Sequence, residues 1–138
     1  MTLGPATHPC GSCPCRKDAP SGVWHETEYA KLPEYDKPTT EQPQGAFLCH
    51  QQDGHLCAGW VGCHDMNESL ALRLAAAAGS ISLEEVERTR TYESPVPLFG
   101  SGQETADHGG KDIDDPGVRA RRTRGRLLEK LKDKGVTA

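Results

Sequence analysis

The sequence predicts a small, loop-rich α+β domain whose apolar core is too small to hold it together alone. Its 138 residues are enough for one domain with a possible tail. Leu, Ile, Val and Phe make up 22 of them, about 16%, which is low for a chain that buries a full core. The 15 glycines and 10 prolines predict many turns, and a net charge of −4 is lower than disordered chains usually carry. We therefore expect a cross-link besides apolar packing.

The first predicted element is a cysteine knuckle, Cys10-Gly11-Ser12-Cys13, with Cys15 close behind it. A C-x2-C pair in a loop rich in glycine and proline lets two sulfurs reach the same side of a tight turn. A short amphipathic helix is predicted over His25–Leu32, where apolar residues lie three apart and a proline follows. The proline-containing segment 33–44 predicts an extended loop.

A β-hairpin is predicted over residues 46–58. Residues 46–50 and 55–58 favour strands, and the Asp53-Gly54 dipeptide between them is a typical turn. Counted from this turn, Cys49 and Cys57 are expected to face each other, so that both thiols point to one face of the hairpin.

The rest of the chain predicts helices. The clearest is Asn67–Ala78, capped by Asp65 or Asn67, ended by Gly79, and carrying one apolar face made of Leu70, Leu74 and Ala77. Ser82 and Glu85 form a capping box that opens a second helix toward Thr91. Further helix starts are expected at Ser101 and at Asp115-Pro116, and the last helix would end at Gly135.

Cysteine and charge divide the chain into two parts. Residues 1–112 are expected to form a cysteine-rich domain, metal-binding on the cysteine pattern considered next and helical in its second half, and residues 113–138 a basic amphipathic helix or tail. Residues 117–134 hold eight basic and two acidic side chains, a net of +6, whereas the remainder holds eight basic and eighteen acidic side chains, a net of −10.

Four cysteines predict a closed zinc site. Cys10 and Cys13 would come from the knuckle, Cys49 and Cys57 from the hairpin, and four thiolates suit a tetrahedral structural zinc ion. Such a site contributes on the order of 10–16 kcal/mol in small peptides, which would offset the weak core. An iron–sulfur cluster uses the same ligands and is the alternative, although the C-x2-C-x2-C-x3-C-P run of bacterial ferredoxins is absent.

Four nearby side chains have open roles. His50 and His64 each follow a cysteine directly, and either histidine, or Cys63, could replace or supplement one of the four cysteine ligands. Neighbouring residues of a strand point to opposite faces, so a supporting or surface role is favoured for His50. Cys15 and Cys63 are expected to be small buried apolar residues or, alternatively, a second, redox-active pair.

Three blocks of sequence, Cys10–Pro20, Phe47–Gln52 and Cys57–Trp60, resemble an uncharacterised family of small cysteine-rich proteins from actinobacteria and their phages. The resemblance covers roughly residues 9–110 and its motifs are C-x-x-C-P-x-R, C-H-Q and C-A-G-W. It implies no activity. It does imply shared metal ligands with three companions, namely Cys10, Cys13, Cys49 and Cys57 with Arg16, His50 and Trp60. Cys15 stands where the family often carries an aromatic residue, which puts Cys15, and likewise Cys63, in doubt as ligands.

The companions also make physical sense. Arg16 is expected to offset the negative charge of a zinc ion with four thiolates and to donate hydrogen bonds to sulfur. Gly59 would let the chain turn tightly after Cys57. Trp60 would pack in the core or cover the metal with its ring.

A four-thiolate site leaves no open position for a substrate. The expected function is therefore interaction or regulation with a protein partner. A small metal- or thiol-dependent enzyme that uses His50, Cys15 or Cys63 is an alternative.

The basic segment supports another alternative, a metal- or redox-sensing regulator that binds nucleic acid. Its candidate contacts are Arg119, Arg121, Arg122, Arg124, Arg126 and Lys130. The acidic body would repel nucleic acid, and an apolar stripe of Leu127, Leu128 and Leu131 would let the helix dock on the body instead.

Nothing in the sequence predicts secretion or membrane insertion. Residues 1–9 lack a basic region followed by an apolar run, and the longest apolar stretch, residues 74–79, is far shorter than the ~20 residues of a spanning helix. A cytoplasmic location without membrane contact is expected, and there cysteines more often bind metals than form disulfides.

Overall fold

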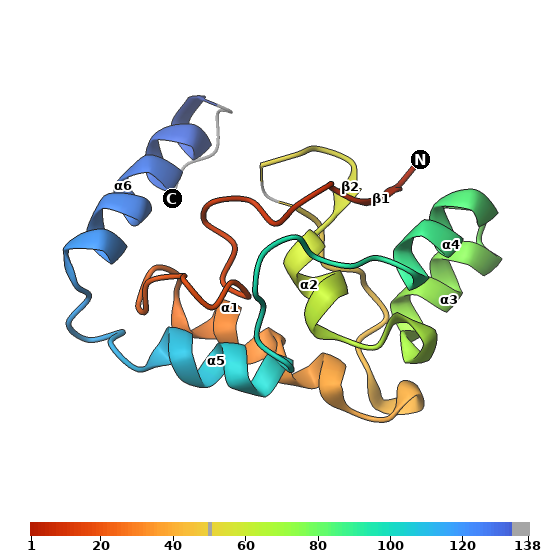
Figure 1. Cartoon of the computed structure of the whole chain (residues 1–138), viewed down its shortest axis with the longest axis horizontal. Helices are drawn as coiled ribbons and strands as arrows, with labels where there is room; N and C mark the ends of the chain where they lie inside the picture. Colours follow the sequence, from red (N-terminus) through yellow and green to blue (C-terminus); the bar gives the residue numbers. More distant parts are fainter. Residues whose placement is uncertain (50, 134–138) are drawn as a thin grey trace.

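The computed structural model describes residues 1–49 and 51–133 and confirms the α+β class (Figure 1). Its strands are β1 (Leu3–Pro5) and β2 (His55–Leu56). Its α-helices are α1 (Glu26–Lys31), α2 (Ala58–Cys63), α3 (Leu70–Ala77), α4 (Leu83–Arg90), α5 (Gly102–Gly110) and α6 (Val118–Asp133). Three 3-10 turns, η1 (Pro33–Asp36), η2 (Thr39–Glu41) and η3 (Met66–Glu68), occur in the connections, and the first two interrupt the predicted extended loop.

Serine hydroxyls begin three of the helices. Ser69, Ser82 and Ser101 each accept the N–H of the third helical residue, which otherwise has no partner in the helix. The starts predicted at Ser82 and Ser101 are therefore confirmed. The helix predicted from Asn67 begins later, because Ser69 is its cap and the preceding residues form η3. Gly79 follows α3 with a φ of 73°, a conformation that suits glycine.

The sheet differs from the predicted hairpin. β2 pairs in parallel with β1, Leu3 lying opposite His55. Of the hairpin, the described residues form one antiparallel bridge, between Leu48 and Leu56. β1 has no strand pattern in the sequence, because Gly4 and Pro5 interrupt it. A distant contact fixes it, since the Gly4 N–H donates to the Glu85 carboxylate at 3.0 Å.

Helix α2 lies at the centre of the main core. Its Trp60 is 1% exposed and packs in the same cluster as Leu32 and Leu72. Helix α3 contributes Leu72 and Ala71 to this core, so the face predicted for it is wrong. Leu74, which was expected to be buried, is 42% exposed.

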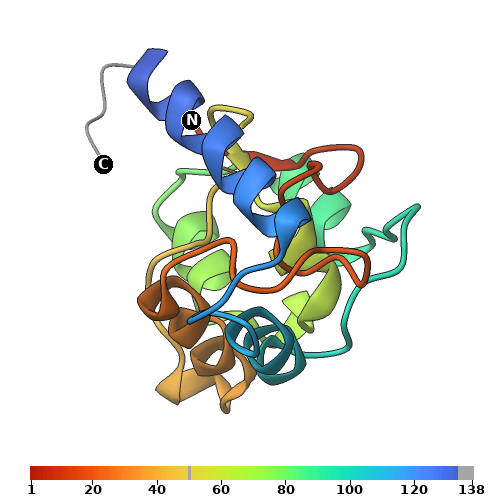
Figure 2. The same cartoon turned by 90° about the vertical axis from the view of Figure 1, so that its left-hand side faces the viewer.

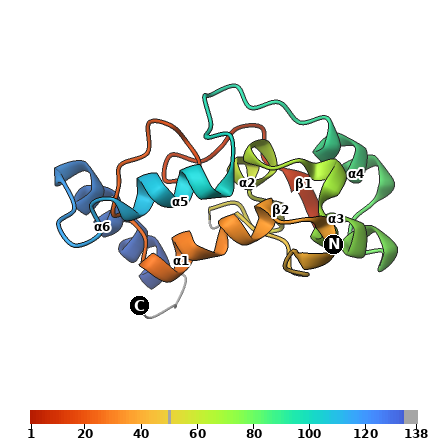
Figure 3. The same ribbon diagram turned by 90° about the horizontal axis from the view of Figure 1, so that it is seen from below.

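The helices are arranged along the long axis of the molecule. α3 and α4 pack together at one end, α1 and α5 lie side by side nearer the middle, and α6 forms the other end (Figures 1 and 3). Viewed toward that end, α6 runs diagonally across the front (Figure 2). No helix within the described part of the chain has the length and apolar character needed to cross a bilayer.

Helix α6 is docked on the body. Ala120 and Leu127 are buried in a second apolar cluster with Val23, and Trp24 packs against it. Arg124 donates to the backbone carbonyls of Gly22 (2.5 Å) and Val23 (3.3 Å). The basic segment is thus a helix that packs against the body through one face, which carries the buried residues Ala120 and Leu127.

Candidate metal centre

The cysteine knuckle is held in place by a distant loop. The Cys13 N–H donates to the Cys10 carbonyl (3.1 Å), which closes the expected tight turn. The next residues run beside residues 97–99: the Phe99 N–H donates to the Cys15 carbonyl (3.0 Å), and the Lys17 N–H donates to the Pro97 carbonyl (3.1 Å). These bonds fix the backbone from which Cys13 and Cys15 project.

The second pair of cysteines lies where the reduced hairpin leads into α2. The Leu48–Leu56 bridge sets the register, with the Cys49 N–H donating to the His55 carbonyl (2.9 Å) and the Cys57 N–H to the Phe47 carbonyl (2.8 Å). The sequence predicted that Cys49 and Cys57 face each other directly, but in this register they do not. They are diagonal neighbours, and the alternation of a strand still places both on one face.

The knuckle and the second pair meet through their thiols. Cys13 forms side-chain hydrogen bonds with both Cys57 and Cys15, and the Cys63 thiol donates to Cys15 with the two sulfurs 3.6 Å apart. Four thiols from two separate segments, the knuckle and α2 with its N-cap, are thus in a continuous chain of contacts, Cys57–Cys13–Cys15–Cys63. All four are buried, and each is in the free thiol form.

The other two cysteines lie close to one end of this chain. Cys10 is half-buried and within electrostatic reach of Cys49 and Cys57, and its sulfur is 3.7 Å from the Ser12 hydroxyl. Cys49 is buried and acts electrostatically on Cys57. All six cysteines therefore belong to one cluster, which we call the thiol cluster.

Burial and mutual contact raise the pKa values of four of these thiols, those of Cys10, Cys13, Cys15 and Cys57. Burial raises the pKa of Cys10. The hydrogen bond with Cys15 and burial raise the pKa of Cys13 well above its usual value. The hydrogen bond with Cys13 lowers the pKa of Cys15, but the hydrogen bond with Cys63 and burial raise it by more, so the pKa of Cys15 is raised. The hydrogen bond with Cys13 and burial raise the pKa of Cys57. A cation bound here would have to displace protons.

Gly59 permits the close approach of α2 to the knuckle. A Cβ atom at this position would overlap the Cys13 sulfur and lie 2.9 Å from the Cβ of Cys15. The sequence predicted a different role, a tight turn after Cys57, but residue 59 is inside the first turn of α2. The missing side chain provides space rather than backbone freedom.

Arg16 and Trp60 lie beside the thiol cluster. The Arg16 guanidinium donates to both carboxylate oxygens of Asp18 (2.8 and 2.9 Å) and to the Pro9 carbonyl rather than to sulfur, and its charge acts on Cys10 and Cys13 at longer range. Trp60 is a core residue, and its indole N–H is the one buried side-chain nitrogen or oxygen within the described residues that has no hydrogen-bond partner. His50 lies outside the described residues.

His64 connects the far end of the cluster to a carboxylate. Its Nδ1 is 3.2 Å from the Cys63 sulfur and 2.8 Å from the Trp60 carbonyl, and its Nε2 is 3.2 Å from Asp36. Asp36 also accepts the N–H groups of Gly102 and Gln103, at 2.8 Å each. Cys63, His64 and Asp36 border an open surface cleft of about 550 Å³.

The thiol contacts are pairwise. Across residues 1–49 and 51–133, no three or more histidine, cysteine, aspartate or glutamate side chains form an arrangement that could hold a metal ion. The donor set nevertheless fits zinc by its chemistry, because it is soft, buried and made of thiols alone.

The basic side chains of α6 divide between contact and exposure. Besides Arg124, three of them bind the body or the preceding turn: Arg119 donates to the Asp18 carbonyl (2.9 Å), Arg121 to the Pro116 carbonyl (2.7 Å) and Lys130 to the Gln51 side chain (3.1 Å). Arg122 and Arg126 are exposed.

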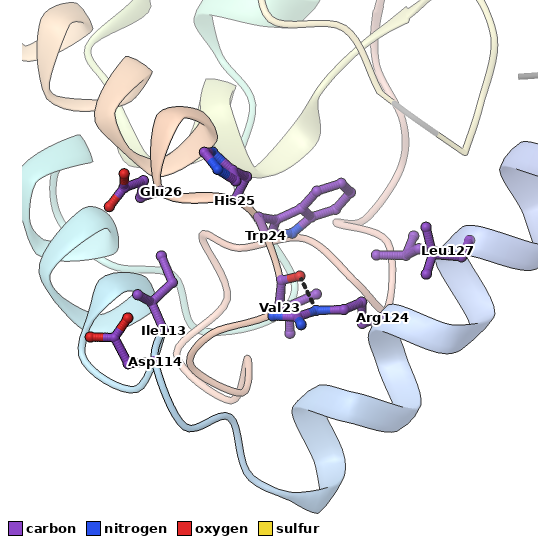
Figure 4. A pocket seen from close by; sticks show the side chains of 9 residues that line it. Val23, Trp24, His25, Glu26, Ile113, Asp114, Arg124 and Leu127 are labelled. Atoms are coloured by element: carbon purple, nitrogen blue, oxygen red, sulfur yellow. Dashed lines mark hydrogen bonds between the residues drawn. The ribbon is translucent and has the colours of Figure 1, made fainter. Parts of the chain in front are cut away.

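A second cleft, of about 580 Å³, lies under α6. Trp24 and Leu127 line its apolar side, while Glu26, Asp114 and Arg124 give it charge (Figure 4). The dashed contact in Figure 4 shows Arg124 bonded to the Val23 carbonyl, so this arginine anchors the helix. The cleft contains no thiol and does not join the cluster.

Two contacting residues were not predicted from the sequence. Gln51 donates to the Ser12 hydroxyl (2.6 Å), and Asp36 pairs with His64. Gln51 follows the C-H dipeptide and could have been noted with it, but Asp36 carries no local signal, because it reaches His64 only through the packing of η1 against α2.

Comparison with known proteins gives one positive finding. No curated protein and no solved structure matches the chain. The model of a family of unknown function, DUF6283, matches residues 5–122, a range that contains all six cysteines and the start of α6. The match spans most of the sequence, so the chain belongs to this family of unknown function.

Proposed function

We propose that the protein is a small interaction or regulatory protein whose fold is held by a zinc ion bound to Cys10, Cys13, Cys49 and Cys57. The observation that carries the proposal is the contact between the Cys13 and Cys57 thiols, which joins the knuckle to the segment after β2. Cys10 and Cys49 lie within electrostatic reach of Cys57 at the same end of the cluster.

The ion would be structural. Four thiolates close the coordination sphere of zinc, so no position is left for a substrate. In a chain with so small an apolar core, zinc binding that joins the two segments would supply a large share of the folding free energy. In zinc-finger peptides, zinc binding contributes on the order of 10–16 kcal/mol.

A short series of contacts supports a regulatory role. Ser12, inside the knuckle, accepts from Gln51 (2.6 Å), and Gln51 accepts from Lys130 of α6 (3.1 Å). The Trp24 indole, which packs near α6, donates to the Ser12 carbonyl (3.4 Å). A change of knuckle geometry on gain or loss of the ion would therefore reach the basic helix.

Elemental analysis and native mass spectrometry of protein purified under reducing, anaerobic conditions test the proposal. We expect bound zinc and a marked fall in Tm after chelation. The double variant C10S/C49S should lose the ion of this site, whereas H8Q, which removes an exposed histidine, should keep it. An ion-free protein with unchanged Tm contradicts the proposal. A brown protein that contains stoichiometric iron and sulfide would show that the cysteines bind an iron–sulfur cluster instead of zinc.

The second candidate is a metal- or redox-sensing regulator that binds nucleic acid through α6. The exposure of Arg122 and Arg126 supports it. Fluorescence anisotropy with duplex DNA at low salt should then show binding that weakens steeply with salt. The variant R122S/R126S should bind less tightly than the matched control K17S/K111S. No binding at low salt, with or without zinc, rules this candidate out.

The third candidate is a thiol-dependent enzyme. The contacts from Cys63 to His64 and from His64 to Asp36 support it, because a nucleophilic thiolate is stabilised by a neighbouring imidazole N–H that is itself oriented. Rapid alkylation of Cys63 alone by iodoacetamide in the chelated protein is the expected sign. Cys63 is only 4% exposed, and slow alkylation of all six thiols together would contradict this candidate.

A further inference from the structure

We propose that the thiol cluster binds a second zinc ion, with Cys15 and Cys63 as its terminal ligands and with Cys13 and Cys57 bridging the two ions. This inference rests on the proposed zinc site at Cys10, Cys13, Cys49 and Cys57. It extends that site to the two buried thiols that the site leaves unused.

The pairwise contacts in the cluster are among those of two tetrahedra that share an edge, and zinc would have to draw the thiols together from this pairwise arrangement. Cys13 and Cys57, which share a side-chain hydrogen bond, would form the shared edge. On one side of them Cys10 and Cys49 lie within mutual electrostatic reach. On the other side Cys15 touches Cys13 and Cys63, and it also acts electrostatically with Cys57. Each side, with the shared pair, supplies the four thiolates that a zinc ion needs.

The separation of the Cys15 and Cys63 sulfurs fits the second ion. With Zn–S bonds of about 2.3 Å, the edge of a regular tetrahedron of sulfurs is about 3.8 Å. The Cys15 and Cys63 sulfurs are 3.6 Å apart, close to that edge. A disulfide would need them at about 2.05 Å.

Charge does not oppose the second ion. A single zinc ion with four thiolates would leave Cys15 and Cys63 as buried neutral thiols. A second divalent cation replaces the two protons of these thiols, so the net charge of the cluster does not change. The burial cost that separate thiolates would incur is therefore avoided.

The surroundings suit a bound thiolate at Cys63. The His64 Nδ1 is 3.2 Å from this sulfur, and the Nε2 of the same ring is 3.2 Å from Asp36. Hydrogen bonds of this kind commonly orient and stabilise the ligands of a metal site. Gly59, whose backbone lies against Cys13 and Cys15, leaves the sulfurs room.

Zinc stoichiometry tests the inference. Titration of the chelated protein with zinc, followed by native mass spectrometry, should give two ions per chain. C15S/C63S should retain one and stay folded, because the first site is intact. C10S/C49S should also retain one, and H8Q should retain both.

Cadmium NMR provides a test without any variant. Protein loaded with ¹¹³Cd should give two resonances that are coupled to each other, because only bridging thiolates join the two ions. Suppose that the wild type binds one ion, that C10S/C49S loses it and that C15S/C63S keeps it. This result overturns the second site but keeps the proposed function. Three results overturn both the second site and the proposed function. They are a protein without a bound ion, an ion that is kept in C10S/C49S but lost in C15S/C63S, and an iron–sulfur cluster.

Discussion

Gly59 is the residue where the thiol cluster tolerates least change. A methyl group there would meet the Cys13 sulfur and the Cys15 side chain, both of which are fixed by burial. We predict that Gly59→Ala destabilises the protein by about 1–3 kcal/mol through overpacking and weakens zinc binding. Denaturant unfolding and competition with a zinc chelator measure the two effects.

Gly125→Ala is the matched control. Gly125 lies in the interior of α6, and nothing is within 4 Å of a Cβ placed on it. This substitution should stabilise the protein by roughly 0.5–1 kcal/mol, since glycine is a poor helix former. Equal effects at positions 59 and 125 would contradict the packing role of Gly59.

Tyr29 satisfies two backbone donors with one oxygen. Its hydroxyl accepts the N–H groups of Val23 and Trp24, at 3.1 Å each, at the point where α6 docks. Tyr29→Phe should cost about 1–3 kcal/mol, because it leaves these donors without a partner. Tyr92→Phe, which loses one exposed bond to the Thr7 carbonyl, should cost less in the same unfolding assay.

The same tyrosine predicts a loss of stability at alkaline pH. Burial raises the pKa of Tyr29 above its ordinary value of 10.0, so the folded state favours the neutral phenol. Its contribution is therefore complete below pH 10 and is lost as pH rises through the folded-state pKa. Denaturation midpoints from pH 8 to 11 should fall more steeply for the wild type than for Tyr29→Phe; parallel curves would exclude this role.

At the scale of elements, β1 depends on one carboxylate. Glu85 accepts from the Gly4 N–H (3.0 Å) and from Arg88 (2.8 Å). We predict that Glu85→Ala speeds amide hydrogen exchange in residues 2–5 while the exchange of α2 is unchanged. Glu84→Ala, an exposed change on the same helix, is the control. Unchanged exchange of β1 in Glu85→Ala would show that its pairing with β2 is sufficient.

Local signals predicted the helices better than the strands. The Ser82 and Ser101 caps act within one helical turn, so their helices could be found from the sequence. β1 and its parallel pairing depend on contacts with residues more than fifty positions away, for which Leu3-Gly4-Pro5 gives no local sign. The apolar face of α3 was misjudged because Leu70 and Leu74 fit the helical period as well as the pairs Ala71/Ala75 and Leu72/Ala76, which face the core.

At the scale of the whole molecule, the cysteine spacing predicted which segments meet but not how many thiols take part. The knuckle and the segment after β2 do come together, as Cys13 and Cys57 show. Cys15 and Cys63 join them only because α2 packs against the knuckle at Gly59. That packing depends on the tertiary fold, so the sequence named Cys15 and Cys63 as possible additional ligands but left their grouping with the others open.

Chelation should loosen the end of the molecule that carries α6 more than the opposite end. Ser12, Gln51 and Lys130 connect the knuckle to α6, whereas α3 packs against α4, and α4 packs against β1 and η3. Hydrogen-exchange mass spectrometry with and without zinc should show faster exchange in α6 and little change in α4. Gln51→Ala should reduce the difference, and uniform exchange across the chain would contradict the coupling.

The parallel pairing of β1 has a consequence for biosynthesis. Residues 3–5 are synthesised well before their partners, β2 and Glu85. They must therefore stay unpaired on the nascent chain until these partners have left the exit tunnel. Closure of β1 is consequently a late event in the folding of this chain.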